Sequence, residues 1–91
     1  MTILRMMRRG MDRDLYYEMR AMLDIDRKHP LGLIMHGASE VDGRMEVAQV
    51  WESEEYARRF DEEILAPIVE ALGAPRDVDV TVVELEDLVT P

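Results

Sequence analysis

The dipeptide Asp42-Gly43 lies between two apolar segments and constrains the fold of this chain more than any other feature. Both central residues of the favoured hairpin turn need a positive φ, which Asp-Gly pairs supply readily. The segment before the turn, Leu31–Ala38, is predicted to be a strand, and Met45–Trp51 is predicted to be its antiparallel partner. The centre of the chain is therefore a β-hairpin.

The turn also predicts the register of the hairpin, because the residues that flank it pair with each other. In that register His36 lies opposite Gln49, and Ile34 lies opposite Trp51. Side chains alternate between the two faces of a strand. One face is then expected to carry Ile34, His36, Val47, Gln49 and Trp51, and the other Leu33, Met35, Ala48 and Val50.

A strand and a helix are predicted before the hairpin. The strand covers Thr2–Met7, and Arg8-Arg9-Gly10 is expected to form the following turn. Asp12 is a suitable N-cap for a helix that ends at Lys28-His29-Pro30, because the residue before a proline disfavours the helical conformation. Apolar residues recur at helical spacing. The inward stripe is expected to be Leu15, Tyr16, Met19, Met22 and Leu23.

A helix and a strand are predicted after the hairpin. Ser53 is the expected N-cap of the second helix, and Gly73 is its expected C-terminal cap. Between them, Pro67 is expected to break or kink the helix, or to begin a short following one. The fourth strand is predicted over Val78–Leu85. The buried stripe of this helix is expected to be Tyr56, Ala57, Phe60 and Ile64.

The element order βαββαβ is that of the ferredoxin-like α+β fold, with a four-stranded antiparallel sheet and both helices on one face. The 91 residues fit a single domain, residues 1–91. The strands are apolar on both faces, but two helices cover only one of them. The uncovered face would be a large exposed apolar patch, so we expect a homodimer that packs sheet against sheet.

Charge and composition exclude several functions. The net charge of −9 disfavours binding to nucleic acid or to an anionic membrane. The chain has no cysteine, so disulfides and thiolate chemistry are absent. Arg5, Arg8 and Arg9 interrupt any signal-like apolar core, and no apolar run approaches the roughly 20 residues of a membrane helix. We therefore expect a cytoplasmic protein.

Three segments resemble the dimeric α/β barrel superfamily, and more narrowly small bacterial proteins of the antibiotic-biosynthesis-monooxygenase type. They are Pro30–His36, Asp42-Gly43 and Val50–Glu55, and the last contains the Trp-x-Ser motif Trp51-Glu52-Ser53 that leads into the second helix. The resemblance implies a barrel built from two sheets across a homodimer. It also implies a pocket between sheet and helices on the Trp51 face. Members of the superfamily include cofactor-free oxygenases, haem degraders, lactone isomerases, polyketide cyclases and proteins of no known activity.

His36 is the candidate for acid–base catalysis, because it is the one histidine within a predicted strand. Its unperturbed pKa near 6.5 lets an imidazole exchange protons at neutral pH. Gln49, opposite it, is a polar residue among apolar neighbours and could orient His36 or bind a substrate carbonyl. The alternatives are a structural histidine bonded to Gln49 and one that faces solvent.

Three aromatic residues are candidates for substrate binding. The indole of Trp51 offers a stacking surface and one N–H donor to a planar aromatic ligand. Tyr16 and Tyr56 lie on the inward stripes of their helices and could place a hydroxyl in the pocket. Each of the three could instead be a packing residue of the core.

Arg5 lies in the middle of the first strand, which is central in this topology. A buried guanidinium needs a partner, and we expect an ion pair with Glu46 or Glu84 rather than binding of an anion.

No cofactor or metal is expected. Two histidines and no cysteine give no metal cluster of convincing spacing, and no glycine-rich phosphate loop is present. The haem-degrading branch uses a histidine on its second helix, and Glu54–Leu72 has none. The oxygenase branch commonly has an asparagine four residues before its Trp, and this chain has Val47 there.

The function expected from these features is that of a small-molecule-binding homodimer. Such a protein could act as a cofactor-free monooxygenase, cyclase or isomerase on an aromatic or polyketide-like substrate. The alternative is a non-catalytic ligand-binding or interaction dimer. An open cavity beside His36 would favour the enzyme, and a filled one would favour the alternative.

Overall fold

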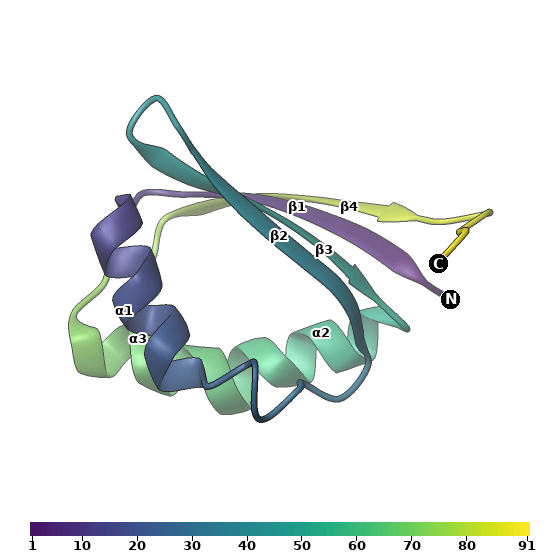
Figure 1. Cartoon of the computed structure of the whole chain (residues 1–91), viewed down its shortest axis with the longest axis horizontal. Coiled ribbons are helices and arrows are strands. Elements are labelled where there is room, and N and C mark those ends of the chain that lie inside the picture. The colour runs from purple at the N-terminus through teal and green to yellow at the C-terminus, as the bar shows by residue number, and fades with distance from the viewer.

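Four antiparallel strands form one sheet, and the helices cover one of its faces (Figure 1). The computed structural model describes residues 1–91, and the order of strands in the sheet is β2-β3-β1-β4. The predicted ferredoxin-like α+β fold is confirmed. The elements are β1 (Ile3–Arg9), α1 (Arg13–Leu23), β2 (Leu33–Val41), β3 (Arg44–Trp51), α2 (Glu54–Phe60), the π-helical segment η1 (Asp61–Leu65), α3 (Ala66–Leu72) and β4 (Val78–Glu84).

The hairpin between β2 and β3 turns at the predicted dipeptide. Asp42 and Gly43 both have positive φ, 52° and 76°. Val41 pairs with Arg44 as predicted, so the ladder continues up to the turn. Strand β2 therefore extends beyond its predicted end at Ala38, because cross-strand hydrogen bonds stabilise the polar residues next to the turn.

The far end of the hairpin differs from the prediction by one residue. His36 lies opposite Gln49, as predicted, but Trp51 lies opposite Leu33 and not opposite Ile34. An irregularity between Leu33 and Met35 inserts an extra residue into β2. Such a β-bulge shifts the alternation of side chains, and here it turns Leu33 into the core in place of Ile34.

Strand β1 is longer than predicted and includes Arg8 and Arg9, where the sequence indicated a turn. Both residues pair with β3 on one side and β4 on the other, so two ladders hold them in the sheet. Alternation then places Ile3, Arg5, Met7 and Arg9 on the same buried face. Arg9 was expected in the turn, and its burial follows from the extra length of the strand.

Helix α1 begins as predicted and ends early. The Asp12 side chain accepts a hydrogen bond from the Leu15 backbone N–H at 2.9 Å, which confirms the N-cap. The helix stops at Leu23, before the predicted end at Lys28, because Asp24 adopts a left-handed conformation that caps it. Met22 is exposed and not part of the buried stripe.

The second helical region runs from α2 through η1 into α3. Ser53 caps its start, and Gly73 at φ 61° caps its end, both as predicted. Pro67 lies in the first turn of α3, the second of its two predicted positions, where its missing N–H is tolerated. The wider turn of η1 changes the helical phase. Leu65 is therefore buried, whereas the predicted Ile64 is 43% exposed.

The core fills the layer between the sheet and the helices. Trp51 is its largest fully buried side chain, with no exposed surface, and its ring lies 5.4 Å from that of Phe60 on α2. None of the helices is long and apolar enough to cross a membrane.

Replacing Trp51 with alanine is expected to lower the free energy of unfolding by about 3–5 kcal/mol, because it empties the largest volume in the core. Chemical denaturation monitored by far-UV circular dichroism measures the change. Leu31→Ala is the control, since Leu31 is exposed and should shift stability by less than about 0.5 kcal/mol. Equal effects of the two substitutions would contradict a buried structural role for the indole.

Candidate functional site

Four of the five predicted site residues meet in one hydrogen-bond network. The hydroxyl of Tyr16 on α1 lies 2.7 Å from Nε2 of His36 on β2. Nδ1 of His36 lies 3.2 Å from Nε2 of Gln49 on β3. The carbonyl oxygen of Gln49 accepts from Trp51 Nε1 at 2.9 Å and from Arg5 Nη2 at 2.7 Å. Sheet register and helical periodicity together produce this cluster.

Arg5 extends the network to the second helical region. It pairs bidentately with Asp61 of η1, at 2.5 Å and 3.1 Å. The predicted partners Glu46 and Glu84 are therefore wrong. Glu46 projects from the opposite face of the sheet, where it lies 3.9 Å from Arg8, while Arg5 points toward the helices.

The two donors to Gln49 fix the orientation of its amide. Because the carbonyl oxygen accepts from Arg5 and Trp51, the amide NH₂ faces His36 and donates to Nδ1. An imidazole whose Nδ1 accepts carries its proton on Nε2, so His36 donates to the hydroxyl of Tyr16. The Tyr16 proton is then free to donate to another acceptor.

The pKa shifts of Tyr16 and His36 agree with a neutral imidazole that donates to the Tyr16 hydroxyl. Burial, followed by the charge of Arg20, lowers the pKa of His36 below its usual value and favours the neutral ring. Burial raises the pKa of the Tyr16 phenol, and the Arg20 guanidinium opposes that change. Near neutral pH the site therefore presents a protonated hydroxyl held by a neutral imidazole.

The network borders a small interior cavity of about 30 Å³. That volume suits one water molecule and not a substrate. Tyr16, Arg20 and His36 also line an open hollow of about 320 Å³ at the surface beside β2. The apolar walls of the interior cavity are formed by Met7, Met19, Leu23, Ile25, Val47, Phe60 and Leu65.

Tyr56 lies outside the network, although the sequence placed it among the site residues. Its ring packs against Gly32, which has a φ of 85° and no room for a side chain, since a Cβ there would lie 2.5 Å from Cγ of Tyr56. Tyr56 instead lines a separate surface hollow with Pro30 and Leu31. Trp51 contributes its N–H to Gln49, but its ring is enclosed by the core and has no exposed surface.

Three charged residues of the site were not predicted as such. Arg5, Arg9 and Asp61 all lie between the sheet and the second helical region. The alternation of Arg5 and Arg9 along β1 was visible in the sequence, but the predicted turn at Arg9 hid it. No group of three or more histidine, aspartate or glutamate side chains is arranged to hold a metal ion.

The chain shares its fold with several solved structures. No family model and no curated protein matches the sequence. Among solved structures, the cofactor-independent oxygenase SnoaB of Streptomyces nogalater has a TM-score of 0.65 at 14% identity, over 99% of this chain and 96% of that one. Rv0793 of Mycobacterium tuberculosis has a TM-score of 0.68 at 17% identity, over 99% and 100%. The chain shares their fold.

A candidate antibiotic biosynthesis monooxygenase of Deinococcus radiodurans has the same architecture, with a TM-score of 0.65 at 14% identity over 100% of this chain and 98% of that one. The predicted resemblance to the antibiotic-biosynthesis-monooxygenase type of dimeric α/β barrel is thus confirmed for the fold. At these identities the likeness concerns the fold alone.

The lowered pKa of His36 predicts a pH-dependent stability. The unfolded chain binds a proton as the pH falls through about 6.5, before the folded protein does, so the free energy of unfolding decreases as the pH falls. His36→Gln lacks this contribution. Denaturation at pH 7.5 and pH 5.5 should therefore show a larger loss for the original protein than for the variant. Equal losses would show that His36 is not held neutral by the fold.

Proposed function

We propose that the protein is a homodimer that binds a small aromatic or polyketide-like molecule between its sheet and helices. There it would act as a cofactor-free monooxygenase, cyclase or isomerase. The observation that carries this proposal is the partly buried, hydrogen-bonded series Tyr16–His36–Gln49 beside an apolar cavity. The fold that the chain shares with the cofactor-independent oxygenase SnoaB supports it.

The chemistry follows from the polarity of the series. Substrates of this class ionise at an enol or a phenol, and the negative oxygen needs a donor placed in an environment of low dielectric constant. The Tyr16 hydroxyl provides that donor, while His36 and Gln49 hold it in position. Met7 and Met19 line the cavity with flexible thioether side chains, which adapt to ligands of different shape.

A second function is favoured by one observation. The interior cavity, about 30 Å³, is far smaller than the several hundred cubic ångströms of an ordinary ligand pocket. A substrate must therefore displace Phe60 or Leu65, or bind in the open hollow outside. If the side chains do not move, the cluster is a structural network and the protein is a non-catalytic interaction dimer.

Tyr16→Phe distinguishes the two functions, because it removes the hydroxyl and leaves the ring. With 1,8-dihydroxyanthrone as a probe, oxygen consumption above the spontaneous rate should fall by about 10²-fold, the scale of losing one oxyanion donor. Tyr56→Phe is the matched control, since Tyr56 lies outside the network and lines a separate surface hollow. No rate above the spontaneous one in the original protein would refute the monooxygenase activity on this probe, and an unchanged rate in Tyr16→Phe would refute the role of the Tyr16 hydroxyl as the donor.

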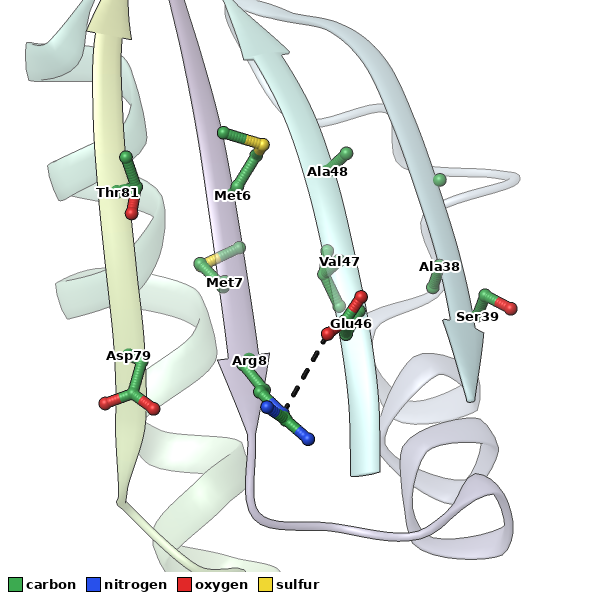
Figure 2. A pocket seen from close by; sticks show the side chains of 11 residues that line it. Met6, Met7, Arg8, Ala38, Ser39, Glu46, Val47, Ala48, Asp79 and Thr81 are labelled. Carbon is green, nitrogen blue, oxygen red and sulfur yellow. Dashed lines mark ion pairs between the residues drawn. The ribbon is translucent and has the colours of Figure 1, made fainter. Parts of the chain in front are cut away.

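The dimer is proposed to form through the face of the sheet that the helices leave uncovered. Figure 2 shows this face, with Met6, Ala48 and Thr81 lying across neighbouring strands and the helices behind them. The residues border a broad groove of about 540 Å³, and Met6 and Met35 are 44% and 53% exposed. Exposed methionines bordered by polar residues such as Arg8 and Glu46 are characteristic of a protein interface.

Sedimentation velocity at micromolar concentration should give about twice the monomer mass of 10.6 kDa. Met6→Glu places a charge at the centre of the uncovered face and should shift the protein to a monomer. Met22→Glu, on the exposed side of α1, is the matched control and should leave the dimer intact. A monomeric original protein, or a dimer that tolerates Met6→Glu, would refute this interface.

A further inference from the structure

Arg9 is a buried cation without a carboxylate partner. It is 9% exposed at the end of β1, and its side chain points toward the helices. Its one side-chain hydrogen bond joins Nη2 to the sulfur of Met7 at 3.8 Å, and it forms no ion pair within 4.0 Å. A thioether is a weak acceptor, and the other nitrogens of the Arg9 guanidinium are not fully buried and have no protein partner.

Asp61, the carboxylate whose charge attracts Arg9, forms no ion pair with it. Asp61 is held bidentately by Arg5, so two guanidinium groups share one negative charge. Burial lowers the pKa of Arg9, attraction to Asp61 raises it, and repulsion from Arg5 lowers it again. An arginine nevertheless remains protonated at neutral pH. The layer between sheet and helices thus retains an uncompensated positive charge.

Arg9 also lies where a ligand could reach it. Arg9 and Leu65 line the interior cavity, and both line an outer pocket of about 310 Å³ between α3 and β4. Arg76 and Glu70 lie at that outer pocket. Tyr16 borders the interior cavity too. Arg9 and Leu65 are therefore the two residues that line both cavities.

We propose that Arg9 is the anchor for an anionic group of the ligand, a carboxylate on a flat apolar molecule that enters through the outer pocket. This inference rests on the proposed small-molecule function and adds its charge selectivity. A planar guanidinium pairs with a carboxylate through two parallel hydrogen bonds. A bound carboxylate would balance the charge that Asp61 leaves uncompensated, whereas a neutral ligand would not.

The test compares 2-naphthoate with the neutral isostere 2-naphthamide by isothermal titration calorimetry and by amide chemical shifts. The carboxylate should bind about ten-fold more tightly or better, the scale of one charge-assisted pair, and Arg9→Met should abolish that preference while Arg9→Lys retains part of it. Arg58→Met is the matched control, because it removes the same charge from an exposed position on α2. It should leave the preference unchanged.

Thermal stability without ligand provides a second measurement. Arg9→Met removes an unpaired buried cation and keeps most of the side-chain volume, so its melting temperature should equal or exceed that of the original protein. A purely structural arginine would give a lower melting temperature, and that result would contradict the anchor.

The outcomes separate this inference from the proposed function. If both probes bind equally and shift the amides around Tyr16, the small-molecule site stands and the Arg9 anchor is refuted. If neither probe binds at millimolar concentration, the anchor and the site between sheet and helices are both refuted. A carboxylate preference that survives Arg9→Met would also refute the anchor.

Discussion

The hydrogen bonds to the carbonyl oxygen of Gln49 connect the core to the candidate site. This oxygen is buried and must be satisfied, and it accepts from both Trp51 and Arg5. Because two donors bind this oxygen, the amide NH₂ of Gln49 faces His36. The tautomer of the imidazole thus depends on the packing of an indole and on the ion pair that Asp61 makes with Arg5.

The fold was predictable where local chemistry decides the backbone, and not where packing decides it. Asp42-Gly43 fixed the turn and the nearby register because both residues tolerate positive φ. The bulge that buries Leu33 in place of Ile34 has no comparable local signal, because it depends on how β2 fits against β3. The π-helical turn that buries Leu65 in place of Ile64 likewise depends on packing against the sheet.

The candidate site shows the same division. Tyr16 was predicted on the inward side of its helix, and His36 and Gln49 on one face of the hairpin, because helical and strand periodicities are local patterns. Tyr56 shares the stripe of its helix but packs against the start of β2, away from His36. Arg9 was missed because its neighbours resemble a turn, and only pairing with strands on both sides holds it in the sheet.

The distribution of charge bears on which function the fold carries. The chain has a net charge of −9, yet the layer between sheet and helices contains Arg5 and Arg9 against the single carboxylate of Asp61. Packing alone gives little reason to retain Arg9, because apolar residues of similar volume often stabilise a protein as well as a buried charge does. The ligand proposed above would neutralise this cation beside the cavity. An anionic ligand would then be repelled by the acidic surface and attracted at the outer pocket, where Arg9 and Arg76 lie.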